Sequence, residues 1–335
     1  NQPSPTASTG VGMIADNHNL KCLIMKIVDR KYIVPFCLVT LLFLLWGLAN
    51  NMTVTLQSAF KRIMSMSDLQ TTLIQFAFCG SYFCFAIPAA LFIRRFSFKS
   101  GAVLGLALYA AGALMFMPAA KVGSYAFYLI AIYIMAGGCG VLETTANPYI
   151  LLMGDKRTAT QRLNIAQAFN PLGCIMGILM SQYFILSELS GATAADRAAM
   201  SHSELAALQA HELNAVTGTY TVLGIALLII LIIMLFVKMP EGHDNNRDSI
   251  IKTFKRLIHN GKYVFGVLAE FFYVGAQVSV WAFTIRLVMQ ESNILEAGAA
   301  NVYLISIIGF SVARFLFTWL MKWYRPSALL MLASA

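Results

Sequence analysis

Charged residues are scarce in this sequence. Asp, Glu, Lys and Arg make up 12% of its 335 residues, whereas hydrophobic residues make up 59% and the mean hydropathy is +0.70. Because soluble globular domains are about one quarter charged, this composition excludes an ordinary soluble enzyme. It also excludes a disordered segment, a collagen-like chain and a small secreted module built on disulfides. The remaining class is a polytopic membrane protein.

Recognisable catalytic and metal-binding patterns are missing as well. The six cysteines form no Cys-x-x-Cys pair, and all five histidines lie outside the long apolar stretches. His211 and Glu212 begin like a zinc-protease motif, but Ala215 stands where the second histidine would be. The chain has no phosphate-binding loop. We therefore expect no enzymatic activity, no metal site and no cofactor.

Long apolar stretches dominate what is present. Crossing a bilayer takes about 20 apolar residues in a helix. Eight stretches qualify, at residues 33–56, 71–93, 101–118, 125–151, 163–186, 215–237, 263–289 and 298–320. A ninth begins at Pro326 and stops with the chain at Ala335. Since the apolar runs are continuous rather than alternating, they predict an all-α polytopic membrane protein, apparently truncated, with eight full transmembrane helices and the start of a ninth.

The distribution of basic residues predicts the orientation. With the N-terminus in the cytoplasm, 18 of the 24 Lys and Arg residues fall in cytoplasmic segments and four in external ones. This asymmetry is the positive-inside pattern of membrane proteins. It accounts for the net charge of +9, so nothing in the charge supports nucleic-acid binding.

The connecting segments suggest a division into parts. Residues 187–214 predict a short external helix, and residues 238–262 separate the sixth span from the seventh. In the latter segment, apolar and basic residues occupy opposite faces of one helix, which predicts a helix lying on the inner leaflet. The predicted parts are a cytoplasmic N-terminal segment (1–32), a six-helix half (33–237), a cytoplasmic connecting segment (238–262) and a partial second half (263–335). This is the layout of a transporter built from two six-helix halves.

Only two acidic residues lie within the predicted spans, Glu143 and Glu270. Glu143 is deep in the fourth span and shares a helical face with Asn147. A carboxyl removed from water favours its neutral form, so Glu143 is a candidate proton carrier, the alternative being a structural residue between helices. The sequence leaves open the roles of the other charged residues in spans, which are Glu270, Arg286 and Arg314.

Amide and tryptophan side chains recur at helical spacing in three spans. They are Trp46, Asn50 and Asn51 in the first span, Asn164, Gln167 and Asn170 in the fifth, and Gln277 and Trp281 in the seventh. Amides both donate and accept hydrogen bonds, which suits sugar hydroxyls, and an indole ring packs against the apolar face of a sugar. The pattern therefore predicts a sugar site. The alternative is a set of interhelical amide contacts with an interfacial aromatic residue.

Glycines accompany these polar residues. Gly173 and Gly177 lie four residues apart in the fifth span, and Gly137, Gly138 and Gly140 come just before Glu143. Small residues at such spacing allow helix backbones to approach closely. We expect a structural role for these glycines.

Four stretches that carry the polar residues resemble the fucose–proton symporter family of sugar transporters in the major facilitator superfamily. They are Leu45-Trp46-Gly47-Leu48-Ala49-Asn50-Asn51, Leu142-Glu143-Thr144-Thr145-Ala146-Asn147-Pro148, Arg162-Leu163-Asn164-Ile165-Ala166-Gln167-Ala168-Phe169-Asn170, and Tyr273-Val274-Gly275-Ala276-Gln277 followed by Trp281. The resemblance runs from about residue 33 to the end of the chain. It implies a twelve-helix fold with a central sugar cavity and alternating access.

The resemblance also implies roles for individual residues. Glu143 would be a protonation site linked to sugar binding. The candidate sugar-binding residues are Asn51, Gln167, Asn170, Trp281, Trp46, Asn50, Asn147 and Gln277. One position departs from the family, whose first span carries an aspartate where this chain has Val54. The family's pair of carboxylates is thereby reduced to Glu143.

We predict from the sequence a sugar permease of a bacterial inner membrane. The first expectation is L-fucose:proton symport by a monomer whose partners are a small sugar, protons and the lipid bilayer. A glucose/galactose permease or an amino-sugar permease is the alternative within the class. Because of Val54, a facilitator or a non-transporting sugar-binding membrane protein is a further alternative. Without the remaining helices of that fold, the 335 residues alone are expected not to transport.

Overall fold

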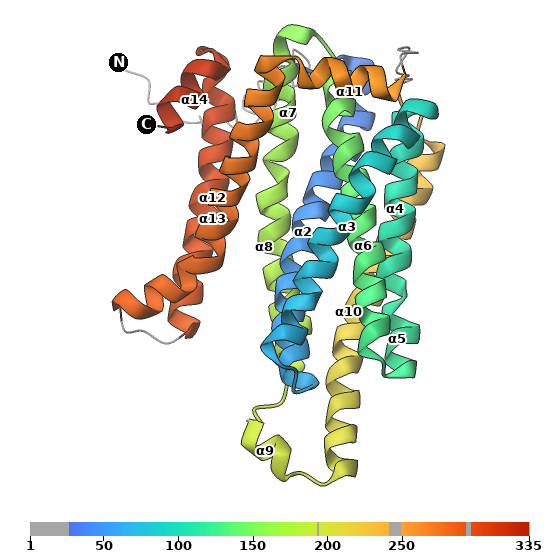
Figure 1. Cartoon of the computed structure of the whole chain (residues 1–335), viewed down its shortest axis with the longest axis vertical. Coiled ribbons are helices and arrows are strands. Elements are labelled where there is room, and N and C mark those ends of the chain that lie inside the picture. The colour runs from blue at the N-terminus through green and yellow to red at the C-terminus, as the bar shows by residue number, and fades with distance from the viewer. Residues whose placement is uncertain (1–26, 193, 241–248, 293–295, 335) are drawn as a thin grey trace, which may run out of the picture. The chain divides into compact units, whose positions relative to one another are not determined.

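Long apolar helices make up this computed structural model, which describes residues 27–192, 194–240, 249–292 and 296–334 (Figure 1). Seven helices among the described residues are long and apolar enough to cross a membrane. They are Arg30–Ile63, Leu69–Arg95, Phe98–Val122, Tyr125–Leu151, Lys156–Glu188, His202–Phe236 and Gly261–Val280. These match the first seven predicted spans. The described apolar part of the next helix, Leu304–Leu320, is shorter, so the eighth span and the partial ninth stay predictions.

The described residues form helices and no strand, as the continuous apolar runs predict. The α-helices are α2 (Ile33–Ile63), α3 (Asp68–Arg95), α4 (Phe98–Leu114), α5 (Phe116–Val122), α6 (Tyr125–Leu151), α7 (Ala159–Gln167), α8 (Phe169–Phe184), α9 (Ala194–Ala199), α10 (His202–Phe236), α11 (Ile250–Ile258), α12 (Gly261–Ser292), α13 (Glu296–Leu320) and α14 (Pro326–Ser334). Short 3-10 turns occupy Arg30–Tyr32, Lys156–Thr158 and Leu186–Glu188.

The chain divides into two compact units. One comprises Asn1–His243 together with Arg314–Ala335, and the other comprises Asp244–Ala313. The first unit contains α2 to α10, and its buried apolar core joins side chains from these helices. The boundary at residue 243 falls within the predicted connecting segment, but the assignment to two transporter halves stays a prediction.

Glycines let helices of the first unit pack backbone against backbone, as predicted. A Cβ atom on Gly173 of α8 would overlap the carbonyl oxygen of Leu44 in α2, and one on Gly177 would lie 2.7 Å from the carbonyl oxygen of Leu48. A Cβ on Gly138 of α6 would likewise overlap the backbone of α4. The α2–α8 and α4–α6 contacts thus depend on the absence of side chains at these positions.

Several helix boundaries differ from the predicted spans, and two of the differences have a local cause. Helix α10 begins at His202, well before residue 215, because Ser201 and Glu204 form a capping box in which each side chain accepts a hydrogen bond from the other's backbone N–H. The third predicted span is divided into α4 and α5. Pro118 has no N–H to donate to the carbonyl of Leu114, and α4 ends at that residue.

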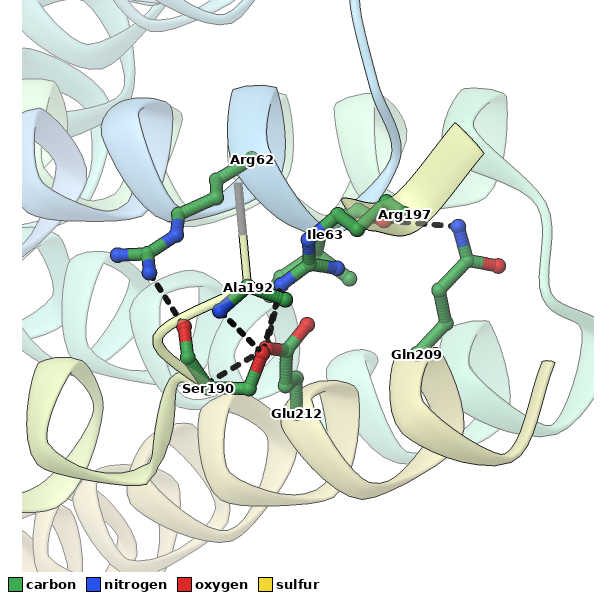
Figure 2. A network of polar contacts seen from close by, with 7 residues as sticks. All are labelled: Arg62, Ile63, Ser190, Ala192, Arg197, Gln209 and Glu212. Carbon is green, nitrogen blue, oxygen red and sulfur yellow. Dashed lines mark hydrogen bonds and ion pairs between the residues drawn. The ribbon is translucent and has the colours of Figure 1, made fainter. Parts of the chain in front are cut away.

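A polar network fixes one end of the first unit (Figure 2). Arg197 of α9 and Glu212 of α10 form an ion pair with 2.6 Å between Nη2 and Oε1, and their side chains are 3% and 0% exposed. The same Glu212 oxygen accepts a hydrogen bond from the backbone N–H of Ser190 at 2.9 Å. Gln209 of α10 donates to the carbonyl oxygen of Ile63, the last residue of α2, at 2.8 Å. These contacts tie α9, α10 and the end of α2 together, and α9 provides the short helix predicted within 187–214.

Candidate functional site

The structure brings three predicted site residues together on α6 and α7. Glu143 and Asn147 are one helical turn apart on α6, and the Asn147 side-chain amide donates to the Glu143 carbonyl oxygen at 3.2 Å. Gln167, the last residue of α7, donates from Nε2 to Oδ1 of Asn147 at 3.0 Å. Asn147 thus has its donor and its acceptor oriented by two neighbours. The predicted face of the fourth span and the predicted stripe of the fifth meet at this residue.

A hollow of about 410 Å³ opens beside this group. Its lining residues are Tyr82, Ala86, Gly140, Glu143, Thr144 and Asn147. A carboxyl, an amide, a phenol and an aliphatic hydroxyl therefore surround one space. Together they offer hydrogen-bond donors and acceptors with one acidic group that can take up or release a proton.

Tyr82 of α3 is a site residue that the sequence analysis missed. Its side chain lines the same hollow as Glu143. The Tyr82 hydroxyl and the Trp46 indole N–H are buried, and neither makes a hydrogen bond within the described part of the chain. Buried polar atoms are ordinarily satisfied, so the hydroxyl of Tyr82, which lines the hollow, is a candidate to bind a ligand or water there. The available signal was a polar-tipped aromatic residue inside an apolar span.

The fifth predicted span is interrupted within its polar stripe, between α7 and α8. Pro171 has no N–H to donate to the carbonyl of Gln167, the residue four positions earlier. The guanidinium of Arg314 donates to that carbonyl at 2.8 Å instead. Gln167 therefore contacts Asn147 through its side chain and Arg314 through its backbone. Arg314, whose role the sequence left open, is directed at protein backbone.

Two other predicted sugar ligands lie along the contact between α2 and α8. The amide of Asn170 donates to the carbonyl oxygen of Phe43 at 3.3 Å, and the amide of Asn51 donates to the carbonyl oxygen of Gly47 at 3.4 Å. Both side chains are half-buried. The Asn170 amide donor is used between the two helices and the Asn51 amide donor within α2, and neither residue lines the hollow described above.

The remaining predicted residues are placed elsewhere. Asn50 is half-buried on α2, and Val54 on the same helix is 56% exposed. Gln277 is half-buried on α12, in the second unit. Trp281 belongs to the same helix, but its side chain lies outside the described part of the structure, as does that of Arg286. Glu270 is exposed on α12.

The described residues contain no group of three His, Cys, Asp or Glu side chains that could hold a metal ion. The groups that line the hollow can form hydrogen bonds with a polar solute, and Glu143 adds a carboxyl group to them. A solute rich in hydroxyl groups would match the alternation of donors and acceptors.

Comparisons with known proteins identify relatives for almost the whole chain. Residues 36–335 match the Major Facilitator Superfamily. The L-fucose-proton symporter of Haemophilus influenzae is 40% identical over 92% of this chain and 73% of its own length. That of Escherichia coli is 35% identical over 90% of this chain and 70% of its own length. A glucose/galactose transporter of Brucella abortus is 31% identical over 86% of this chain and 67% of its own length.

Solved structures agree with the sequence comparison. A crystal structure of the Escherichia coli fucose:proton symporter superimposes with a TM-score of 0.81 at 33% identity, covering 90% of this chain and 74% of the other. A fucose transporter structure in the outward conformation gives the same TM-score at 34% identity, covering 89% of this chain and 73% of the other. A proton:xylose symporter, 15% identical with a TM-score of 0.52, shares the fold.

Proposed function

The chain belongs to the fucose–proton symporter family of the Major Facilitator Superfamily, and from this membership we propose that it carries L-fucose together with a proton. Its relatives are transporters rather than enzymes. We place it in a bacterial inner membrane with its N-terminus in the cytoplasm, where the basic residues predict it, and we propose that it acts as a monomer.

One observation carries the proposed sugar site, namely the hydrogen bond between Gln167 and Asn147 beside the Glu143 hollow. It supports a site in which amides from two helices are held in fixed positions and can meet neighbouring hydroxyls of one sugar. We propose that Trp46 and Tyr82 complete this site with an aromatic surface and a hydroxyl. Asn50, Asn51, Asn170, Gln277 and Trp281 stay as proposed sugar-binding residues.

Glu143 is the proposed proton site. It is the acidic residue that lines the hollow, so its charge changes beside the place where the sugar would bind. In this scheme the protonated carboxyl favours a sugar-competent, outward-facing state, and the proton is released on the inner side. Coupling then follows from linkage, because a proton that raises sugar affinity is itself bound more tightly when sugar is present.

Two alternatives remain in the proposal. The 31% identity to a glucose/galactose transporter favours glucose or galactose as the alternative to L-fucose. An amino sugar is a further alternative within the class. Val54, in the position of the family's aspartate, favours a facilitator without proton coupling or a sugar-binding protein without transport. Amide and hydroxyl groups alone do not distinguish an axial from an equatorial sugar hydroxyl.

The test is uptake of labelled L-fucose by the complete reading frame that contains this sequence, expressed in cells that lack their own fucose carrier. We expect accumulation that collapses when the proton gradient is dissipated. Uptake that only equilibrates and ignores the gradient would indicate a facilitator. If the cells take up glucose or galactose but no fucose, the proposed substrate is wrong and one of these sugars replaces it. If they take up none of the sugars, the protein is not a sugar permease.

A further inference from the structure

Helix α11 (Ile250–Ile258) separates apolar from basic side chains around its circumference. At 100° per residue, its apolar side chains fall within one arc of about 120°. These are Ile250, Ile251, Phe254, Leu257 and Ile258, and the opposite side carries Lys252, Lys255 and Arg256. An arc of this width on a helix indicates one surface that faces an apolar environment.

Much of the apolar arc of α11 is exposed. Ile251, Phe254 and Ile258 are 80%, 64% and 53% exposed, respectively. Leu257 at the edge of the arc is half-buried, and so is Thr253 beside it. The chain therefore covers one edge of the arc and leaves the other exposed. Lys255 borders this exposed edge, because it is the next side chain around the circumference of the helix after Ile258 and Ile251.

The position of α11 in the chain places this surface at the membrane boundary. Nine residues extend about 14 Å, which is too short to cross a hydrocarbon core of about 30 Å. Only two residues separate α11 from α12, which is long and apolar enough to span. Within their shared unit, α11 runs across the end of α12 rather than in line with it (Figure 1). A helix in this position lies along a bilayer surface.

The positive charge of the segment that contains α11 favours anionic lipids. Residues 249–262 contain four cations, Lys252, Lys255, Arg256 and Lys262, and no Asp or Glu. The basic residues of the whole chain predict that this segment lies on the cytoplasmic side. Basic amphipathic helices bind bilayers that carry anionic headgroups, because apolar insertion and charge attraction act together.

We propose that α11 binds the cytoplasmic leaflet, with Ile251, Phe254 and Ile258 inserted among the acyl chains and Lys255 beside anionic phospholipid headgroups. This attachment fixes the level at which α12 enters the bilayer. It does not depend on which sugar the protein carries, and it would hold for a facilitator or a non-transporting protein as well.

The test uses the full-length protein in a cysteine-free background, reconstituted in vesicles with brominated acyl chains, with or without phosphatidylglycerol. A fluorophore is attached at Phe254→Cys, and His259→Cys on the opposite side of the helix serves as the matched control. We expect strong quenching by the lipid bromine at position 254, weak quenching at 259, and a marked increase at 254 when phosphatidylglycerol is present. Lys255→Gln should require about fivefold more phosphatidylglycerol for the same quenching, whereas Lys255→Arg should behave like the parent.

Three results would overturn the proposal. Equal lipid quenching at positions 254 and 259 would show that the helix has no membrane-facing side. Quenching at 254 that ignores phosphatidylglycerol would remove the role of anionic headgroups. Protection of 254 from both lipid bromine and a water-soluble quencher would show that protein covers the face, from this chain or from a second copy.

Discussion

The side chains of Gln167 and Asn147 are joined by a hydrogen bond of 3.0 Å between α7 and α6. Asn147 also donates to the backbone of Glu143, one turn away. A change in the position of either helix therefore alters the surroundings of the acidic side chain at the hollow.

Glu143→Gln keeps the size of the side chain and mimics its protonated form. In the full-length protein we expect exchange of labelled sugar across vesicle membranes to continue, while accumulation driven by a proton gradient is lost. Glu188→Gln, which changes an exposed acid, is the control and should leave both activities unchanged. Loss of exchange as well as accumulation would make Glu143 a sugar ligand or a structural residue.

Tyr82→Phe removes a buried hydroxyl that has no hydrogen-bond partner within the described structure. If this hydroxyl binds sugar, the loss of one hydrogen bond, about 1 kcal/mol, should weaken sugar binding about fivefold. Equilibrium binding of labelled sugar measures the change. Tyr183→Phe, at an exposed tyrosine, should bind like the parent, and an equal affinity in both variants would remove Tyr82 from the site.

Val54→Asp introduces a second carboxylate on α2, at a position that is 56% exposed. If the family's aspartate contributes to coupling, this variant should strengthen the dependence of uptake on the proton gradient. Val54→Asn has a similar shape without the titrating group and should not do so. The ratio of uptake with and without the gradient measures the effect, and equal ratios in the two variants would show that position 54 does not take part in coupling.

Gly173→Ala places a methyl group against the Leu44 carbonyl in the α2–α8 contact. We expect a destabilisation of about 1–3 kcal/mol from overpacking, seen as a lower midpoint of thermal unfolding in detergent. Gly218→Ala in α10 is the matched control, because a Cβ there meets no atom within 4 Å and alanine is the better helix former. A midpoint for Gly173→Ala that equals the control would show that the two helices can separate without cost.

Glu212→Leu leaves the guanidinium of Arg197 buried without its partner and removes the acceptor of the Ser190 N–H. Breaking a buried ion pair in this way costs about 3 kcal/mol, so the variant should unfold at a clearly lower temperature. The double variant Arg197→Met with Glu212→Leu removes both charges and should recover most of the loss. Failure of the double variant to recover would assign the effect to packing or to the Ser190 N–H, which both variants leave without its acceptor, rather than to the unpaired charge.

The positions of the first seven spans could be predicted because a continuous apolar run can be recognised in the local sequence, without knowing how the helices pack. Their ends could not, since the capping box of Ser201 and Glu204 extends α10 beyond its apolar run. Glu143, Asn147 and Gln167 could be grouped from helical spacing together with the family resemblance. Asn170 has the same spacing on its helix as Gln167, but its amide is held at the α2–α8 contact, and spacing within one helix does not reveal which neighbouring helix lies opposite.

Tyr82 shows a second limit of sequence reasoning. It lies in an apolar span, and its polar-tipped ring is the only signal in its own stretch. Its importance comes from α6, whose Gly140, Glu143 and Asn147 line the same hollow. These residues are far from Tyr82 in sequence, so only the packed structure brings them together with it.

The break at Pro171 has a consequence for hydration. Since Pro171 has no N–H, the Gln167 carbonyl lacks the usual donor four residues on, and Arg314 donates a hydrogen bond to it. In hydrocarbon, a carbonyl without a donor costs several kcal/mol. Any movement that withdraws Arg314 must therefore supply another donor, and water is the available one. The hydrogen bond between Arg314 and Gln167 can therefore break readily only where water is already present. The separation of these two residues is tied to the entry of water rather than of lipid.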